Sequence, residues 1–407
     1  MPRNIIPLSK SFMALFGVVA LTAFADPAMT APASAYSVTN LVSDLPGLAA
    51  NTDTNLANPW GLLFDTSGAL VVADNHADVV SFYLDDGTSL DFNLNAKTTP
   101  TGIEVNTSTN DFKISSGANS GPASLIVCTE AGTILGFNGS VDLVNFVVAV
   151  DRSSSGTVYK GMTLAKAGGR QYLYAADFHN GKIDAFDRNF NYLGSFTDPH
   201  VEAGFAPFNI RNIGGWLYVT FAKQLPPGKN DDLAGPGNGF VDIFSPSGFL
   251  IKRLVSHGKL NSPWGLALAP GNFGQFSNSL LVGNFGDGTI NAYHPVSGKH
   301  LGTLSDNAGI PIVINGLWSL KFAPTPAAAG GGKAREDEDD DEGGRGDHGG
   351  GKGVSTLYFS AGINHENDGL VGTITPAKPT HAAHADISAA GAVDQTATAA
   401  ATEPLAD

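Results

Sequence analysis

The sequence predicts an all-β protein built from one repeated unit of four strands, and three observations lead to this expectation. First, 50 glycines are spread among valine, leucine and phenylalanine over 407 residues, which favours many short strands joined by tight turns over long helices. Second, the chain is 42% hydrophobic and 15% charged, so it can bury a sizeable core. Third, two segments two hundred residues apart nearly repeat each other, namely "NPWGLLFDTSG" at 58–68 and "NSPWGLALAP" at 261–270.

The first residues have the form of an export signal. Arg3 and Lys10 precede the apolar run "FMALFGVVALTAF", and small-x-small cleavage patterns end at Ala25 and Ala35. No later stretch approaches the roughly 20 apolar residues that span a bilayer. We therefore expect a signal peptide at 1–35, cleaved after residue 25 or 35. The mature protein would be exported to the periplasm or the extracellular space and have no transmembrane segment.

The net charge and the cysteine content exclude some classes of partner and of chemistry. The formal charge of −15 argues against nucleic acid as a partner, because a phosphate backbone selects a basic surface. Export permits disulfides, but the chain has a single cysteine, Cys128, so no intrachain bridge can form. Cys128 lies in the apolar segment "SLIVCTE", which predicts a buried strand thiol rather than a nucleophile.

Six hairpins follow the same pattern along the chain. Each pairs a β-rich run with a second alternating run across a Gly, Asn or Asp turn, which is the signal of a β-hairpin. The two that follow the Pro-Trp-Gly-Leu segments are "ALVVADNHADVVSFYL" and "SLLVGNFGDGTINAYH". The other four are "SLIVCTEAGTILGFNG", "YLYAADFHNGKIDAFD", "LYVTF" with "NGFVDIFSPSG" after a long insertion, and "TLYFSAGINHENDGLVGTI".

Each hairpin is flanked by further strand candidates. One precedes every hairpin: "WGLLF", "TGIEV", "KGMTLA", "FNIRN", "WGLALAP" and "LWSLKFAP". One follows most of them: "SLDFNLN", "NFVVAVD", "YLGSFTD", "FLIKRLVS" and "HLGTLSD". Six units of about four strands at this spacing predict a six-bladed β-propeller, in which Pro-Trp-Gly-Leu begins the innermost strand of the first and fifth blades.

The sixth unit has no outer strand after it, while the mature chain begins with an unassigned one, "SVTNLVSDLPG". We expect this N-terminal strand to close the last blade, which would leave no long exposed sheet edge. The propeller would then occupy 36–376. Its last blade is interrupted at 327–353 by an acidic, glycine-rich stretch that cannot form a packed core, so we expect a disordered loop there and a disordered tail at 377–407.

The order of segments within a blade resembles the NHL repeat, as in "NPWGLLFDTSGALVVADNHADVVSFY". With the signal peptide, "NLVSDLPGLAANTDTNLANPWGL" and "GNFGDGTINAY", the chain resembles an uncharacterised family of exported bacterial propellers over roughly residues 36 to 375. Members of that family often end in a PEP-CTERM sorting tail, and the last residues here, "HADISAAGAVDQTATAAATEPLAD", lack its apolar anchor and Arg cluster. The resemblance implies a fold and an exported location, but no reaction.

One face of such a propeller is the default ligand site. The turns between second and third strands and the starts of the innermost strands gather there around the central axis. Their carboxylates, amides and imidazoles could hold a divalent cation such as calcium, or hydrogen-bond a sugar or a peptide. The competing interpretation is that Asn and Asp only serve the turns and that the tryptophans fill the core. The candidate ligand-binding residues are Asn58, Trp60, Asp74, Asn75, His76, Asp177, His179, Asn180, Asn284, Asp287, Asn364, His365 and Glu366, with Glu130, Asn261 and Trp264 beside them.

These residues favour a binding or interaction module for an extracellular small molecule, glycan or protein over an enzyme. No nucleophile elbow, His-Glu-x-x-His or phosphate loop is present, so no catalytic residue is predicted. The alternative is a metal-dependent hydrolase, because lactonases of the gluconolactonase type are six-bladed propellers with a Glu, Asn and Asp metal set. This chain has Asn58 near the position of their early Glu. The insertion "AKQLPPGKNDDLAGPGNG" in the fourth unit could overhang the same face or be a passive surface loop.

Overall fold

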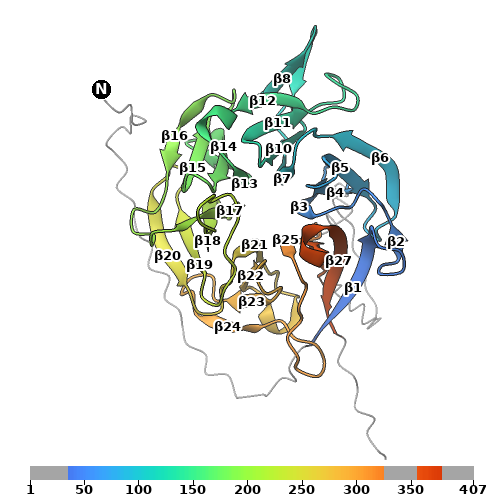
Figure 1. Ribbon diagram of the computed structural model, residues 1–407, viewed down its shortest axis with the longest axis vertical. Coiled ribbons are helices and arrows are strands. Elements are labelled where there is room, and N and C mark those ends of the chain that lie inside the picture. The colour runs from blue at the N-terminus through green and yellow to red at the C-terminus, as the bar shows by residue number, and fades with distance from the viewer. Residues whose placement is uncertain (1–34, 325–354, 378–407) are drawn as a thin grey trace, which may run out of the picture. The chain divides into compact units, whose positions relative to one another are not determined.

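A computed structural model describes residues 35–324 and 355–377 of the chain and shows six β-sheets arranged around a common centre (Figure 1). The predicted six-bladed β-propeller is therefore confirmed. Most of the expected signal peptide, the expected acidic loop and the expected tail lie outside the described residues. Within the described residues, no helix is long and apolar enough to cross a membrane.

Each blade has four antiparallel strands, and in the first five blades these follow one another along the chain from the centre outwards. The innermost strands are β3 (Pro59–Phe64), β7 (Pro100–Val105), β13 (Tyr159–Ala167), β17 (Phe205–Ile213), β21 (Pro263–Leu268) and β25 (Leu317–Phe322). The second strands are β4 (Leu70–Asp74), β10 (Leu125–Thr129), β14 (Arg170–Asp177), β18 (Trp216–Lys223), β22 (Leu280–Asn284) and β26 (Leu357–Gly362). The third strands are β5 (Val79–Tyr83), β11 (Thr133–Phe137), β15 (Lys182–Phe186), β19 (Gly239–Phe244), β23 (Ile290–Tyr293) and β27 (Asp368–Pro376).

The outermost strands are β6 (Ser89–Asn95), β12 (Val147–Asp151), β16 (Tyr192–Phe196), β20 (Leu250–Ser256), β24 (His300–Thr303) and β1 (Tyr36–Ser43). The remaining short elements are strand β2 (Asn51–Thr52), the hairpin β8 (Lys113–Ser116) and β9 (Asn119–Pro122), the turn α1 (Ile363–Glu366) and two 3-10 turns at Ser153–Ser155 and Gly274–Phe276.

The N-terminal strand closes the sixth blade, as the sequence predicts. β1 pairs antiparallel with β27 from Tyr36 opposite Pro376 to Ser43 opposite Leu370. The two-residue strand β2 then adds to the outer edge of β1 in parallel. The first strand of the described chain and the last strand therefore share one sheet, and the edge that β27 would otherwise expose is covered.

The Pro-Trp-Gly-Leu segments are repeated because both begin an innermost strand that packs closely on the next blade. Pro59 and Pro263 are the first residues of β3 and β21, where a missing amide hydrogen does not weaken the sheet. A Cβ atom on Gly61 would lie 2.5 Å from the Thr101 carbonyl oxygen of the next blade. Only glycine allows the innermost strands to approach this closely.

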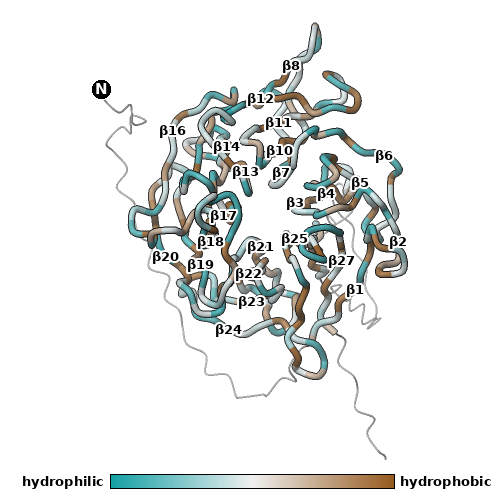
Figure 2. Tube along the Cα trace, viewed as in Figure 1, coloured by the Kyte–Doolittle hydropathy of each residue, from teal (hydrophilic) through white to brown (hydrophobic). Residues whose placement is uncertain are grey.

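The hydrophobic core lies between neighbouring blades rather than in one central mass. Six clusters of buried side chains each join two adjacent sheets, and a seventh lies at the centre. Figure 2 shows the corresponding hydrophobic stretches within the blades, separated by hydrophilic turns. Cys128 is part of this core, and burial raises the pKa of its thiol to about 12, so it is a packing residue, as predicted.

Candidate functional site

One position, repeated in all six blades, brings side chains to the centre of the propeller. In every innermost strand the pairing register with the second strand shifts near the start of the strand, as it does at a β-bulge. A bulge redirects the side chain that it carries. The residues at this position are Trp60, Thr101, Lys160, Phe208, Trp264 and Trp318.

The aromatic members of this set close the centre. Trp60 and Trp318 stack with ring centroids 3.6 Å apart, and Trp264 meets both edge-on at 6.1 and 5.8 Å. Each of the three is at most 4% exposed. The structure therefore places Trp60 and Trp264 in the core, in agreement with the competing interpretation that the tryptophans fill the core. We call Trp60, Phe178, Phe208, Trp264, Phe285 and Trp318 the central aromatic cluster.

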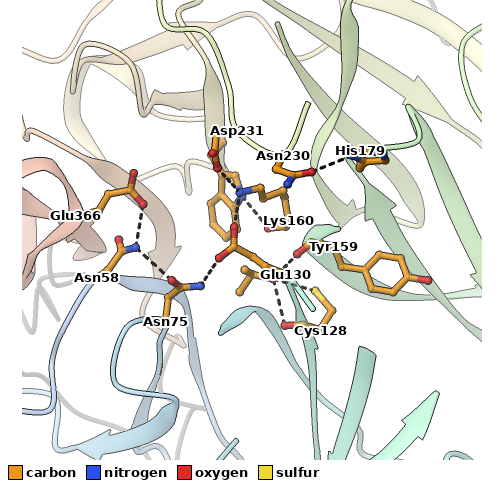
Figure 3. Close-up of polar contacts among 12 residues, drawn as sticks. Asn58, Asn75, Cys128, Glu130, Tyr159, Lys160, His179, Asn230, Asp231 and Glu366 are labelled. Atoms are coloured by element: carbon orange, nitrogen blue, oxygen red, sulfur yellow. Dashed lines mark hydrogen bonds and ion pairs between the residues drawn. The ribbon is translucent and has the colours of Figure 1, made fainter. Parts of the chain in front are cut away.

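A chain of polar side chains lies against this cluster (Figure 3). It runs from Glu366 of the sixth blade through two asparagines of the first blade to Glu130 of the second, Lys160 of the third and Asp231 of the fourth. We call Asn58, Asn75, Glu130, Lys160, Asp231 and Glu366 the polar network.

The two asparagines are buried, and their partners fix how their amides point. Asn58 Oδ1 accepts a hydrogen bond from Trp318 Nε1 at 3.0 Å, and Asn58 Nδ2 donates to Glu366 Oε2 at 2.9 Å. Asn75 Nδ2 donates to Glu130 Oε2 at 3.0 Å and to the Pro100 carbonyl oxygen at 3.2 Å. An indole N–H can only donate and a carbonyl can only accept, so both amides present NH2 groups to the carboxylates.

Lys160 is the buried cation of the network. Its side chain is 3% exposed and forms ion pairs with Glu130 and, at 3.3 Å, with Asp231 Oδ1. Its Nζ also lies 4.9 Å from the ring centroid of Trp60. Burial alone would lower the pKa of Lys160, but Glu130, Asp231 and Glu366 outweigh burial and the pKa is raised. The ammonium group therefore keeps its charge at neutral pH.

Glu366 reaches the network from a turn with an unusual backbone. Asn364, His365 and Glu366 have φ values of 53°, 57° and 67°, so three consecutive non-glycine residues adopt the left-handed region. This conformation costs roughly 1–2 kcal/mol for most L-residues and less for Asn. Burial raises the pKa of Glu366, opposed by the Asn58 hydrogen bond and the Lys160 charge. The strained backbone therefore lies at the residues that place the Glu366 carboxylate in the polar network.

The insertion in the fourth blade, residues 224–238, lies beside the network. Asp231 pairs with Lys160, and Asn230 Oδ1 lies 2.8 Å from His179 Nδ1 of the third blade. On the other side, the amide of Gly235 donates to Asn261 Oδ1 of the fifth blade at 2.6 Å. The insertion thus contacts the blades on both sides of its own and contributes a member of the network.

The candidate residues from the sequence separate into two groups. Asn58, Asn75 and Glu366 join the polar network with Glu130, and His76 Nε2 lies 3.4 Å from Asn58 Nδ2. The others mainly hold their own turns. Asp74 accepts from Ser81, Asp177 accepts from Asn180 and Thr157, Asn284 donates to Asp287 and Thr289, and Asn364 donates to Asp368, while His365 is exposed and His179 contacts the insertion.

The sequence interpretation missed Lys160, Trp318 and Asp231. The signal for Lys160 was present in the six innermost segments. Aligned on the bulge position, they read Trp, Thr, Lys, Phe, Trp and Trp, so Lys160 is the one charged residue of the set. Asp231 had no such signal, because nothing in an irregular insertion predicts which of its residues turns towards the axis.

A metal ion finds few suitable ligands here. Among residues 35–324 and 355–377, no group of three or more His, Cys, Asp or Glu side chains could hold one. Asn58 and Asn75 turn NH2 groups rather than oxygens towards Glu366 and Glu130. The divalent cation expected from the sequence remains a prediction.

Comparisons with known proteins give relatives without an assigned function. No protein-family profile matches the chain. Two uncharacterised proteins of Acanthamoeba polyphaga mimivirus, L690 and R648, are each 32% identical to it over 354 and 353 residues. These matches cover 83% of this chain and 85% and 80% of the two relatives. Among solved structures, virginiamycin B lyase from Staphylococcus aureus shares 10% identity at a TM-score of 0.43, covering 84% of this chain and 100% of the lyase.

Proposed function

The chain belongs to the family of the uncharacterised mimivirus proteins L690 and R648, and from this premise we propose that it is an exported binding module whose polar network binds a hydroxyl-rich ligand, such as a sugar unit of a glycan. The observation that carries the proposal is the polar network itself. Its side chains come from five of the six blades and meet at the centre, and four of the five links along it join one blade to the next.

The charges of the network favour a ligand that donates hydrogen bonds. Three carboxylates face one ammonium group, so an anionic ligand would be repelled. A carboxylate accepts about four hydrogen bonds, and Glu366 accepts one, from Asn58. Asp231 is 71% exposed, so acceptor oxygens remain within reach of solvent. Hydroxyl or ammonium groups would supply the missing donors.

A hydroxyl group fits better than an ammonium group. Trp60 Nε1, in the aromatic cluster beside Lys160, is a buried donor without an acceptor among the described residues. Buried donors are rarely left unpaired in folded proteins. A hydroxyl group donates and accepts, whereas an ammonium group only donates. The combination of spare acceptors and a spare donor therefore supports a neutral, polyhydroxylated ligand.

The test is a binding measurement with a charge-neutral variant. The mature chain is screened against immobilised glycans, and the affinity for any bound glycan is then measured in solution. Glu366→Gln should weaken binding about tenfold, because an amide replaces an acceptor oxygen with a donor. Asp85→Asn, at an exposed position of the first blade, makes the same chemical change and should leave the affinity unchanged.

Two outcomes would overturn the proposal. Binding that is equally weakened, or equally unaffected, in both variants would remove the network as the site. Binding of ammonium compounds or of proteins with no glycan binding would remove the ligand class.

Export is the second part of the proposal, together with membership of an exported bacterial family with NHL-like repeats. It is supported by Arg3, Lys10 and the apolar run that follows them. The protein should accumulate outside the cytoplasm with a new N-terminus after residue 25 or 35, and deletion of 1–35 should retain it in the cytoplasm. N-terminal sequencing of the exported form decides between the two cleavage sites, and an unprocessed cytoplasmic chain would contradict export.

A further inference from the structure

A second position that recurs in all six blades lies at the same end of the propeller as the polar network. It is the first residue after each second strand, where the chain turns towards the third strand. In the first two blades this residue belongs to the polar network, and in the third and fifth it belongs to the central aromatic cluster. The six residues are Asn75, Glu130, Phe178, Gln224, Phe285 and Ile363.

The accessible part of this set is polar on one side of the centre and apolar on the other. Three of the six residues are buried, and the three that are partly exposed are Glu130, Phe285 and Ile363. The fifth blade, which carries Phe285, lies across the centre from the second blade, which carries Glu130 (Figure 1). Ile363 belongs to the sixth blade, beside the fifth. An apolar surface therefore faces a carboxylate across the axis.

Phe285 is a flat ring held in a fixed orientation. It stacks on Trp318 with ring centroids 4.0 Å apart and an interplanar angle of 19°. Trp318 in turn stacks on Trp60 at 3.6 Å and 20°, and both tryptophans are at most 2% exposed. Two buried rings therefore fix the plane of Phe285. Among residues 35–324 and 355–377, no second aromatic ring packs on Phe285, which keeps part of its surface exposed.

The same stack is joined to the polar network by hydrogen bonds. Trp318 Nε1 donates to Asn58 Oδ1 at 3.0 Å, and Asn58 Nδ2 donates to Glu366 Oε2 at 2.9 Å. One indole and one amide thus link the Phe285 ring to the Glu366 carboxylate. The apolar ring and the hydrogen-bonding groups are therefore parts of one rigid assembly, the combination that is typical of ligand sites with a few precisely placed polar groups.

We propose that Phe285 is a stacking platform for the apolar face of a pyranose ring whose hydroxyl groups bind the polar network. This inference rests on the proposed function and names the feature of a sugar that the site selects. A pyranose carries hydroxyl groups around its edge and C–H groups on its faces, so its edge forms hydrogen bonds while a face packs on an aromatic ring. An acyclic polyol has similar hydroxyl groups but no rigid apolar face. Because the Phe285 ring is already fixed, stacking on it costs little side-chain freedom.

The probes are the methyl pyranosides of glucose, galactose and mannose and the corresponding acyclic alditols, titrated into the mature chain and followed by ligand-observed NMR. The wild-type protein should bind at least one pyranoside about fivefold more tightly than its alditol, which is the range of one aromatic contact. Phe285→Leu keeps an apolar side chain but removes the flat face, so it should abolish this preference. Phe285→Tyr retains the face and should retain the preference.

Two further variants serve as controls. Phe92→Leu makes the same change at a matched position on the outermost strand β6, where Phe92 is 48% exposed and stacks on Phe82 at 4.5 Å and 19°. It should leave both affinities unchanged. Glu366→Gln should weaken the binding of pyranosides and alditols alike, because both classes present hydroxyl groups to the network. A thermal melt checks that each variant is folded.

The outcomes separate this inference from the proposed function. A preference for pyranosides that is lost in Phe285→Leu and kept in Phe92→Leu supports the platform. Equal binding of pyranosides and alditols by the wild-type protein, or a preference that Phe285→Leu retains, overturns the platform. If Glu366→Gln still weakens binding in that case, the proposed function stands. No binding of any probe, or binding that Glu366→Gln leaves unchanged, overturns both.

Discussion

The two ends of the innermost strands treat buried charge in opposite ways. At the starts, Lys160 is enclosed by Glu130 and Asp231, and its pKa is raised. Towards the other end, the charge of Arg211 in β17 and burial lower the pKa of Lys321 in β25 to about 8. The innermost strands thus carry one lysine whose charge its neighbours favour and, towards their other end, one whose charge its neighbours disfavour. The difference teaches that neighbouring carboxylates can keep a buried lysine charged, whereas a neighbouring arginine makes the charge of a lysine less favourable.

The largest expected effect comes from removing the compensated cation. Lys160→Met should lower the free energy of unfolding by about 3 kcal/mol, because it leaves the largely buried Glu130 carboxylate without its cation, whereas Asp231 is 71% exposed and contributes little. Chemical denaturation measures this, with Lys166→Met, an exposed lysine of the same strand, as the control. A loss below about 1 kcal/mol, the range of surface pairs, would mean that the network is effectively solvated.

A second substitution isolates the amide that links the network to the aromatic cluster. Asn58→Ala leaves Trp318 Nε1 and Glu366 without their partner and should lower the free energy of unfolding by about 2 kcal/mol more than Ser262→Ala. Ser262 is the matched control, because it precedes the second Pro-Trp-Gly-Leu segment and has a φ of 47° against 49° for Asn58. Equal losses in the two variants would assign the effect to the backbone alone.

Lys321 and Lys160 should contribute to the pH dependence of stability with opposite signs. The folded pKa of Lys321, about 8, lies below its ordinary value of 10.5, so the unfolded chain binds more protons between these values and Lys321 makes the protein more stable as pH rises through them. Lys160, whose folded pKa is raised, contributes stability that is lost only above its ordinary range. The charged groups that act on Lys321 are Arg211 and Glu104, and Tyr358 lies opposite it in β26.

Denaturation at pH 7.5 and pH 9.5 measures this effect. The wild-type chain should gain up to about 2 kcal/mol relative to Lys321→Met over that interval. An equal change in the free energy of unfolding between the two pH values in both proteins would show that Lys321 titrates at its ordinary value.

The smallest expected effect concerns metal. Dialysis against a chelator should leave the melting temperature of the mature chain within about 1 °C, because the carboxylates at the strand starts already accept from amides and Lys160. Elemental analysis of the same sample provides the direct measurement. One tightly held ion whose loss lowers the melting temperature by several degrees would instead favour the metal-dependent hydrolase.

The fold was predictable because each blade carries its own local signal, and the closing strand because "SVTNLVSDLPG" was the one β-rich segment without a hairpin. The site was predictable only in part. Turn residues such as Asp74 and Asn58 look alike in sequence, yet Asp74 binds Ser81 within its blade while Asn58 binds Glu366 across the closure. Which way a turn residue points depends on backbone angles, and contacts such as Lys160 with Asp231 join segments 71 residues apart.

The shared bulge position determines which side chains fill the centre of the propeller. Each blade contributes one residue at this position: Trp60, Thr101, Lys160, Phe208, Trp264 and Trp318. Because each of these residues lies at a shift in strand register rather than within the regular strand pairing, its side chain can differ without altering how the strands of its blade pair. A substitution at one of these six places therefore changes what fills the centre of the propeller, while the strands on either side keep their pairing.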